Sequence, residues 1–336
     1  MHRCMCPPDV EYVLPLRWTN SAHHVSDVTE LAGYLRELSL VADVTVVDGS
    51  EESLRRAHAE AFGPRVRVLQ PAFGIGLNGK VAGVTTGVVA ARHESVVIAD
   101  DDVRYDAASL AAVLARLETA DVVRPQNVFD PMPWHARWDT ARSLLNRALG
   151  GDYPGTLAVR PAALGPDGYD GDVLFENLEL IRTVLARGGI EVRADDILVV
   201  RRPPTARQFL RQRPRQAYDS LAQPTRMIVE LAILPLAVFA SRRPAVAASL
   251  VVGVLALAEY GRRRTGGRGR LPASAVLFAP AWVLERGVLA WVALVFAATG
   301  GIPYAGARLT RAATPTRKLR RRVSAPRAAR GARAAS

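Results

Sequence analysis

The sequence predicts an α/β fold with a largely parallel sheet, and two observations lead to this class. Up to about Tyr218, short apolar runs alternate with segments whose apolar residues recur at helical spacing. This is the pattern of strand–helix–strand units with covered sheet faces. One apolar run ends in Asp100, Asp101 and Asp102, and open α/β sheets bind ligands at the carboxyl ends of their strands. A ligand site is therefore expected at this edge of the sheet.

The expected elements follow one another in chain order. The predicted strands are short and rich in valine, as in VTVVD, whereas the predicted helices are longer and carry a periodic apolar face, as in VTELAGYLRELSLV. A further helix is expected to begin near Asp106. The strands are predicted at 12–16, 44–48, 65–69 and 96–99, and the helices before the acidic triplet at 28–41 and 81–92.

Composition limits the classes of protein to which the chain can belong. Its 336 residues can form one large domain or two smaller ones with ample core. Cys4 and Cys6 lack partners at metal-ligand spacing, so neither a disulfide framework nor a zinc site is expected. The first residues lack the apolar segment of a secretory signal. None of the six histidines is expected to be a metal ligand.

The character of the sequence changes after Thr225. Two apolar stretches, MIVELAILPLAVFA and AVAASLVVGVLALAEY, are followed by a third over Leu271–Gly300, and together they predict membrane helices. The alternative is a buried helical subdomain. The expected organisation is a disordered N-terminus at 1–10, an α/β domain at 11–222, a membrane helical region at 223–304 and a basic disordered tail at 305–336.

Basic clusters flank the apolar stretches and indicate how the chain is oriented in a membrane. GRRRTGGRGR precedes the third stretch, and the tail from Arg308 onward is strongly basic within a chain of net charge +12. The positive-inside rule then predicts a multi-pass protein of the cell membrane whose α/β domain and basic tail face the cytoplasm. Nucleic-acid binding by the tail is not expected, because no aromatic residues are interleaved with its arginines.

The acidic triplet has a simple interpretation and a chemical one. An acidic turn or a helix N-cap explains one aspartate, but three neighbouring carboxylates repel one another and raise one another's pKa. A hard divalent cation, Mg²⁺ or Mn²⁺, held by carboxylates and phosphate oxygens would relieve this repulsion. The triplet therefore predicts a metal site at the end of its strand.

A glycine-rich segment, GIGLNGKV, offers a competing interpretation. Residues Gly74–Val81 match the dinucleotide pattern G-x-G-x-x-G and all but the last position of the P-loop pattern. Four residues separate the preceding strand from the first glycine, however, whereas the dinucleotide fingerprint needs a glycine in the turn itself. Backbone amides of this loop and the ammonium of Lys80 are still expected to meet a diphosphate.

Taken in order, these segments resemble the GT-A-type family 2 glycosyltransferases, especially membrane-attached members similar to ceramide glucosyltransferases. The resemblance runs from about Glu11 to Tyr218. It is carried by YVLP, VVDGS, NGKVAGVTTGVVAA, ADDDV, GTLAVRPAAL with DGYDGDVLFENLEL, and RQFLRQRPRQ. It implies a GT-A fold, a nucleotide-sugar donor such as a UDP- or GDP-sugar, and a lipid or lipid-linked acceptor.

The resemblance also implies roles for individual residues. Asp100 and Asp102 match the outer pair of the D-x-D motif, which holds Mg²⁺ or Mn²⁺ against the donor diphosphate. The metal, rather than a basic side chain, is then expected to neutralise the excess carboxylate. Residues at the family's donor-binding positions are Pro15, Asp48, Lys80, Asp101, Gln212, Arg213 and Arg215, the last three from a motif of the form Q-x-x-R-W.

The sequence departs from the family pattern at two positions. Gln216 replaces the tryptophan of Q-x-x-R-W, and Asn177 stands where the family carries its catalytic aspartate, so it cannot take a proton. Glu176, Asp172 and Glu179 are the candidates to replace that base, with Glu176 preferred because it is adjacent. Acids in a first helical turn also have a simpler explanation in the helix dipole.

The expected function is that of an inverting, metal-dependent glycosyltransferase that acts on a lipid or lipid-linked acceptor. Two alternatives remain open. The acceptor of the first is a polyprenyl phosphate, whose anionic oxygen needs no general base. The second is a non-catalytic, membrane-tethered nucleotide-binding protein.

Overall fold

The computed structural model describes residues 9–19, 25–72, 74 and 76–324. Eight strands form one mixed sheet in the order β3-β2-β1-β4-β7-β6-β8-β5. The first four strands in this order run parallel, β7 is antiparallel to both of its neighbours, and β6 and β8 are again parallel. The strands are β1 (Glu11–Leu16), β2 (Asp43–Asp48), β3 (Val66–Leu69), β4 (Val96–Ala99), β5 (Val103–Arg104), β6 (Val122–Phe129), β7 (Thr156–Val159) and β8 (Glu191–Arg201).

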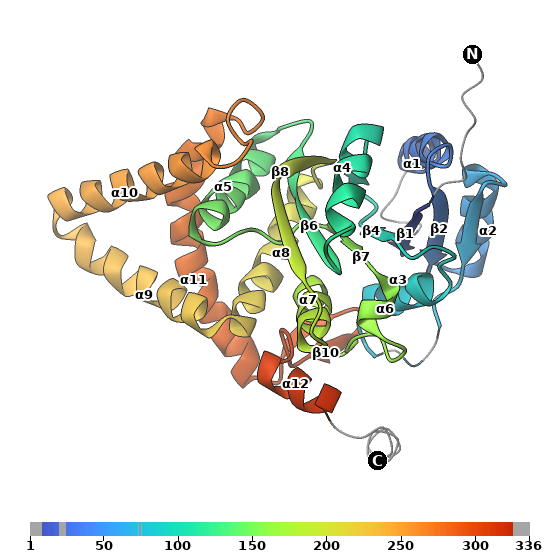
Figure 1. The fold of residues 1–336 in the computed structure, drawn as a ribbon. Helices are drawn as coiled ribbons and strands as arrows, with labels where there is room; N and C mark the ends of the chain where they lie inside the picture. Colours follow the sequence, from blue (N-terminus) through green and yellow to red (C-terminus); the bar gives the residue numbers. More distant parts are fainter. Residues whose placement is uncertain (1–8, 20–24, 73, 75, 325–336) are drawn as a thin grey trace.

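Helices cover both faces of this sheet (Figure 1). Alternate residues of β1 serve opposite faces, since Tyr12 and Leu14 join one hydrophobic cluster and Val13 joins another. The first cluster includes residues of α1 (Val25–Leu38), α2 (Glu52–Phe62) and α4 (Ala107–Leu117). The second includes residues of α3 (Gly79–Val89), α6 (Pro161–Leu164) and α7 (Glu176–Ala186). The predicted α/β class is confirmed, and the predicted strands and helices lie within a few residues of those observed.

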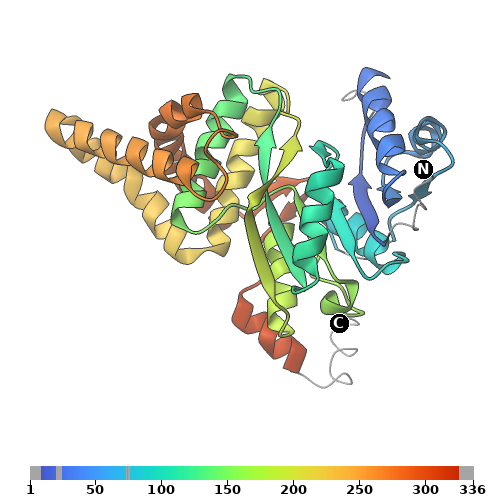
Figure 2. The ribbon, with the colours of Figure 1, turned by 45° about the horizontal axis from the view of Figure 1, so that its top comes forward.

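The apolar C-terminal stretches form a helical hairpin and a third helix. The hairpin of α9 (Pro224–Ser241) and α10 (Pro244–Arg263) extends away from the sheet in Figures 1 and 2. Helix α11 (Ala279–Ala298) packs on α9 and on α8 (Ala206–Tyr218), while α10 packs on α5 (Trp134–Leu149). All three C-terminal helices, the third counted from Ala273, are long and apolar enough to cross a membrane.

These helices share a hydrophobic core with the α/β part of the chain. One cluster combines Leu178 and Tyr218 with Ala290 of α11 and Ile302 of the following segment. A short 3₁₀ helix at Asp219–Ala222 connects the two parts, and a second at Ala273–Phe278, between α10 and α11, packs on α5. The boundary near residue 222 therefore divides the chain by composition but not by packing.

The segment after α11 differs from the expectation of a disordered tail. It forms the hairpin β9 (Ile302–Tyr304) and β10 (Ala307–Leu309) and then helix α12 (Thr316–Ser324). The amides of Leu174 and Phe175 donate to carbonyl oxygens at 311 and 312, at 3.0 and 2.8 Å. The expectation was wrong up to Ser324 because these backbone bonds and the buried Leu319 attach the segment to the α/β part. Residues 325–336 of the tail and 1–8 of the N-terminus lie outside the described residues.

Candidate active site

A polar cavity of about 190 Å³ lies at the carboxyl end of β4. It is bounded by the first residues of α3 and α7, by the end of α8 and the 3₁₀ turn after it, and by α9 and α11. The cavity thus lies between two parts of the chain. One is the strand end at which the sequence predicts a ligand, and the other is the apolar C-terminal helices. Its charged lining residues include Lys80, Asp100, Glu176, Arg201, Asp219 and Arg286.

Basic side chains partly neutralise the acidic triplet. Lys80 Nζ lies 2.5 Å from Asp100 Oδ1, and Arg201 Nη2 lies 3.6 Å from Asp100 Oδ2. Arg201 Nε also donates to Asp102 Oδ2 at 2.8 Å. The expectation that a metal rather than a basic side chain balances these carboxylates is therefore wrong in part. Arg201 arrives from the end of β8, which is distant in sequence and gave no local signal.

Asp100 and Asp102 nevertheless fit a divalent cation. Asp102 Oδ1 is buried and has no hydrogen-bond partner among the described residues. Burial, reinforced by the charges of Asp100 and Asp101, raises the pKa of Asp102 to about 6 although Arg201 opposes the shift. Gly155 leaves room beside Asp100, since a Cβ at this position would lie 2.6 Å from Asp100 Oδ2. Hard carboxylate oxygens of this kind are what Mg²⁺ and Mn²⁺ prefer.

Asp101, the middle aspartate of the triplet, and Asp106, the N-cap of α4, have separate hydrogen-bond partners. Trp18 Nε1 donates to Asp101 Oδ2 at 2.5 Å, so Asp101 is held against the strand end of β1. The sequence gave no signal for Trp18. Asp106, not the triplet, caps α4 by accepting the Ser109 amide at 2.7 Å. The N-cap interpretation therefore does not account for the three aspartates.

Lys80 connects the triplet to Glu176. Its Nζ lies 2.5 Å from Glu176 Oε1 as well as from Asp100 Oδ1. Burial disfavours its charge, but the carboxylates of Asp100 and Glu176 outweigh this and raise the pKa of Lys80. Burial, together with the charge of Asp100, raises the pKa of Glu176 although Lys80 opposes it. The predicted metal ligand, diphosphate contact and base thus meet in one cavity.

Three amides of the glycine-rich segment donate hydrogen bonds within the protein. The amide of Leu77 donates to Asp172 Oδ1 and that of Asn78 to the Gly171 carbonyl, both at 2.9 Å. The Asn78 side chain caps α3 by accepting the Lys80 amide at 3.1 Å. Among the described residues of this segment, the amides of Leu77, Asn78 and Lys80 are therefore already bonded, and the Lys80 side chain is part of the cavity lining. The P-loop and dinucleotide interpretations use such amides to hold phosphate, and they lose the support of these three.

Of the three candidate bases, Glu176 lines the cavity. Glu179 is buried beneath it and accepts the Thr314 amide at 2.5 Å. Asp172 is exposed and is held by the Leu77 amide. Asn177 also lines the cavity and donates to the Pro154 carbonyl at 2.9 Å.

Asp48 and Pro15 lie at the same sheet edge but have structural contacts. Asp48 is fully buried, and its two oxygens interact with His58 Nδ1 at 2.7 Å and the Ser50 amide at 2.8 Å. Burial acts against its charge, yet the bonds from His58 and Ser50 lower the pKa of Asp48. Pro15 packs against Gly83 of α3. Each oxygen of Asp48 thus already has one hydrogen-bond partner, and the nucleoside contact of Asp48 stays a prediction.

The predicted Q-x-x-R motif lies on α8 and mostly faces away from the cavity. Arg213 Nε and Nη2 donate to Glu285 of α11 at 2.5 and 2.8 Å, so this arginine joins two helices. Arg215 lies over the Tyr304 ring at 5.3 Å, and Gln212 is exposed. Gln216, at the position of the missing tryptophan, is the α8 residue that lines the cavity. Gln212, Arg213 and Arg215 are not among the residues that line the cavity, and their contact with a donor stays a prediction.

Two cavity residues come from segments without a motif. Burial raises the pKa of Asp219 to about 7, and its Oδ1 is buried without a partner in the described part of the chain. Arg286 of α11 is 1% exposed, and its nearest ion-pair contact is Glu230 Oε1 at 4.0 Å. The sequence showed Glu285 and Arg286 only as an interruption of an apolar stretch.

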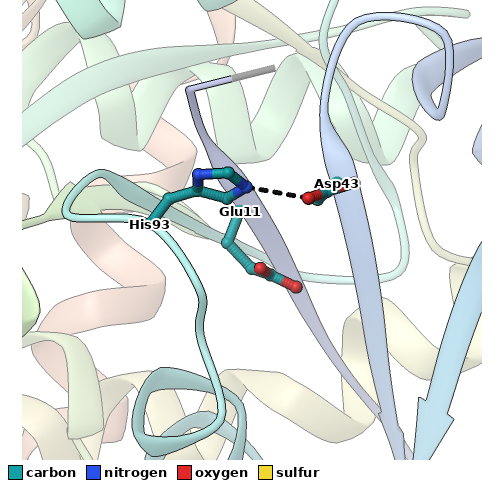
Figure 3. Close-up of side chains that lie close together, drawn as sticks. All are labelled: Glu11, Asp43 and His93. Carbon is teal, nitrogen blue, oxygen red and sulfur yellow. Dashed lines mark hydrogen bonds and ion pairs between the residues drawn. The ribbon is translucent and has the colours of Figure 1, made fainter. Parts of the chain in front are cut away.

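A second group of possible metal ligands lies at the opposite edge of the sheet. Glu11, Asp43 and His93 lie close together at the amino ends of β1 and β2 (Figure 3), with His93 Nε2 at 2.8 Å from Asp43 Oδ2. Arg67 and Arg92 form ion pairs with Glu11 at 3.1 and 3.4 Å. These arginines satisfy the carboxylates, and the group lies away from the cavity.

Part of the chain is similar to a known protein family. Residues 52–136 match the model of the family described as glycosyl transferase family 21. This segment includes Lys80 and the acidic triplet. Among curated proteins, none shows a significant match to the chain.

Solved structures offer weaker likenesses. A mannosyltransferase from Pyrobaculum calidifontis, solved with GDP-Man and Mn²⁺, is 20% identical, and the match covers 87% of each chain at a TM-score of 0.48. Mannosyl-3-phosphoglycerate synthase from Rubrobacter xylanophilus is 16% identical over 62% of this chain and 71% of that one, with a TM-score of 0.40. The Mycobacterium tuberculosis glucosyl-3-phosphoglycerate synthase, solved with Mn²⁺ and UDP-Glc, is 17% identical over 61% and 76%, with a TM-score of 0.41.

The family match covers the segment that contributes the end of β4 and the start of α3 to the cavity. It confirms the predicted enzyme class at the level of glycosyltransferase. On the strength of residues 52–136, the chain is a glycosyltransferase similar to glycosyl transferase family 21.

Proposed function

We propose that the chain is an inverting glycosyltransferase that moves a sugar from a nucleotide-diphosphate-sugar to a lipid or lipid-linked acceptor. One observation carries the proposal: Lys80 joins Asp100 to Glu176 within a single cavity, at 2.5 Å from each. A carboxylate pair, a cation and a second buried carboxylate are the groups that such a transfer needs. The match to glycosyl transferase family 21 supports the same class.

Asp100 and Asp102 are the residues that would hold Mg²⁺ or Mn²⁺. When bound, such an ion stabilises the negative charge that develops on the departing nucleoside diphosphate. The support from this chain is the unpartnered Asp102 Oδ1 and the space that Gly155 leaves beside Asp100. Lys80 lies next to Asp100, where its ammonium would add positive charge against the same diphosphate.

Glu176 is the preferred base for an acceptor hydroxyl. It begins α7, lines the cavity and is held by Lys80 at 2.5 Å. Proton transfer from the hydroxyl to its carboxylate would accompany attack on the anomeric carbon from the face opposite the leaving group, which inverts configuration. An acceptor whose oxygen is already anionic would not use Glu176 in this way.

The acceptor is proposed to be a lipid because apolar helices border the cavity. Helices α9 and α11 contribute Arg226 and Arg286 to its lining and are long and apolar enough to cross a membrane. The resemblance to ceramide glucosyltransferases points to the same acceptor class. We propose a multi-pass protein of the cell membrane with its catalytic part and basic tail in the cytoplasm and a UDP- or GDP-sugar as donor.

The test uses the full-length protein in isolated membranes with a panel of labelled UDP- and GDP-sugars. Label should appear in a lipid extract, disappear on addition of EDTA and return with Mn²⁺ or Mg²⁺. Lys80→Ala should lower transfer by about 10²–10³-fold, the cost of removing one charge-stabilising donor. Lys318, the other lysine of the chain, is exposed on α12, so Lys318→Ala is the matched control.

One outcome would favour the non-catalytic alternative. If a nucleotide-sugar binds tightly but is neither hydrolysed nor transferred to any lipid, the chain is a nucleotide-binding protein and the proposed reaction is wrong. Equal transfer by Lys80→Ala and Lys318→Ala would separately remove the observation on which the proposal rests.

A further inference from the structure

We propose that the acceptor is a lipid phosphate and that Arg286 and Arg226 hold its phosphate group in the cavity. This inference rests on the proposed function and narrows its acceptor class. Three features lead to it: the incomplete pairing of Arg286, its position across the cavity from the acidic triplet, and an apolar groove along the same two helices.

Arg286 is a buried cation with unused donors. Its side chain is 1% exposed, and its Nε and Nη1 atoms have no hydrogen-bond partner within the described residues. The nearest carboxylate oxygen, Glu230 Oε1, lies 4.0 Å away and already accepts a bond from Arg226 Nε at 2.8 Å. A buried charge without a close partner is costly. An anion in the cavity would supply what this guanidinium lacks.

The other cations of the cavity are committed to carboxylates. Arg142 forms ion pairs with Asp139 and Asp152. Arg201 is shared between Asp100 and Asp102, and Lys80 between Asp100 and Glu176. Arg286 and Arg226 share the single carboxylate of Glu230. Asp219 is the other acid near them, and burial raises its pKa to about 7. Arg286 and Arg226 are therefore the cavity cations with the fewest close carboxylate contacts.

These two guanidinium groups lie away from the proposed donor side. Asp100 and Lys80 come from the end of β4 and the start of α3, on one side of the cavity. Helices α9 and α11 pack together on the other side, and Figure 1 shows them across the sheet from α3. A donor diphosphate at the acidic triplet would leave Arg286 and Arg226 to a second anion. Guanidinium groups suit a phosphate because they offer paired donors.

The same helices border an apolar groove of about 510 Å³. Along α9, Leu234 follows Arg226 by two helical turns, about 12 Å, and along α11 Trp291 follows Arg286 by about 7.5 Å. The groove therefore lies along the same two helices as the arginines, and the proposal assigns it to the hydrocarbon chain of the acceptor. The groove is lined by Leu234, Pro235, Val238, Phe239 and Trp291, with Arg242 and Arg243 at the hairpin turn.

The chemistry with this acceptor balances without a base. A phosphate oxygen of the lipid forms a bond to the anomeric carbon, and the bond from that carbon to the donor's terminal phosphate oxygen breaks. The nucleoside diphosphate leaves with the electron pair, and the product is a sugar phosphodiester of inverted configuration. A phosphomonoester is mostly dianionic at pH 7, so no proton has to be removed. Glu176 then serves to position Lys80.

The experiment compares acceptors that differ in one group. Detergent-solubilised full-length protein receives a labelled donor with a polyprenyl phosphate, the corresponding polyprenol, ceramide, or glycerol 3-phosphate. Label should enter only the polyprenyl phosphate, and mild acid should release the sugar from the product. The lipid alcohol lacks the anion, and glycerol 3-phosphate lacks the chain that the groove would hold.

Arg286→Gln tests the assigned residue. The KM for polyprenyl phosphate should rise about 10–100-fold, the range expected for losing a hydrogen bond to a charged group, while the Kd of the donor stays unchanged. Arg226→Gln, a change at a less buried position, should act in the same direction. Arg263→Gln, at an exposed residue of α10 that pairs with Glu259, is the control.

Each contrary result has a separate meaning. Equal transfer to the polyprenol or to ceramide would overturn the phosphate inference and leave the proposed glycosyltransferase intact. Transfer to glycerol 3-phosphate alone would overturn the lipid part. Weaker donor binding with an unchanged acceptor KM in Arg286→Gln would assign this arginine to the donor instead. Failure of the wild type to transfer sugar to any acceptor would defeat the proposed function itself.

Discussion

Gly155→Ala should impair the proposed metal site without removing a carboxylate. A Cβ at this position would lie 2.6 Å from Asp100 Oδ2, whereas ordinary contact begins at 3.4 Å. The carboxylate would have to move by about 0.8 Å, and a misplacement of this size at a reacting centre costs on the order of 10²-fold in rate. The φ angle of Gly155 is not positive, so alanine adds no backbone strain.

The stability of this variant should change little. The group that must move is the end of a short side chain rather than backbone, and Arg201, whose Nη2 lies 3.6 Å from Asp100 Oδ2, limits the direction in which it can turn. We therefore expect kcat/KM to fall about 100-fold and the half-saturating Mn²⁺ concentration to rise, with the melting temperature nearly unchanged. Metal titrations of sugar transfer, together with thermal unfolding, measure all three quantities.

Gly33→Ala provides the matched control. Gly33 lies in α1, and a Cβ there would meet no atom within 4 Å. If Gly155→Ala and Gly33→Ala show the same turnover and the same requirement for Mn²⁺, then Asp100 is not a metal ligand. The reasoning about this sheet edge would then be refuted.

Three further predictions concern the triplet, acid stability and the membrane. Asp102→Asn should lower Mn²⁺-dependent sugar transfer by about 10²-fold. Asp101→Asn should lower it less, because an amide oxygen can still accept the hydrogen bond from Trp18. Equal losses of activity in metal-activation curves of the two variants would contradict this. Burial opposes the charge of Asp139, but Arg142 and Arg213 outweigh it and lower its pKa from 3.8 to about 2. Because this folded-state pKa is depressed, the stabilisation of about 2.5 kcal/mol is complete above the unfolded pKa and is lost as the pH falls through about 2. Wild type and Asp139→Asn should thus differ in melting temperature at pH 7 and converge in acid, and a constant difference would argue against the ion pairs. The full-length protein should sediment with membranes and require detergent, and release by high salt alone would be inconsistent with inserted helices.

The sequence was most informative about the first half of the sheet. Strands such as VTVVD are short apolar runs that are buried on both faces, so periodicity and length identify them. Lys80 and Asp100 were found because each follows a recognisable local pattern. Their meeting with Glu176 depends on how α3, β4 and α7 pack, and the sequence indicated that only through the family resemblance.

Residues that act through distant contacts were missed or misassigned. On α8, Arg213 and Gln216 are three apart and share a face, but the sequence does not say that Glu285 of α11 lies opposite Arg213. Asp48 lies at a strand end, where ligands often bind. In the structure its carboxylate interacts with His58, which lies ten residues later on α2. A motif fixes the spacing of its residues but not the side chains that other elements bring to them.

The basic tail shows that a run of charged residues is limited as a predictor in the same way as a motif. Its arginines favour disorder when read alone. In the structure, Arg311 and Arg322 form ion pairs with Asp170, each at 3.0 Å, and Leu319 is buried. A carboxylate 141 residues before Arg311 and 152 residues before Arg322 thus holds two arginines of the tail, the second of them in helix α12. No local pattern carries that information.

The most direct test of the account is to locate Mn²⁺ by anomalous scattering in crystals of the full-length protein grown with a nucleoside diphosphate. The account predicts a peak within about 2.0–2.6 Å of carboxylate oxygens of Asp100 and Asp102, with the diphosphate between the ion and Lys80. A peak at Glu11, Asp43 and His93 instead, or bound nucleotide with no ion at the triplet, would contradict the proposed site.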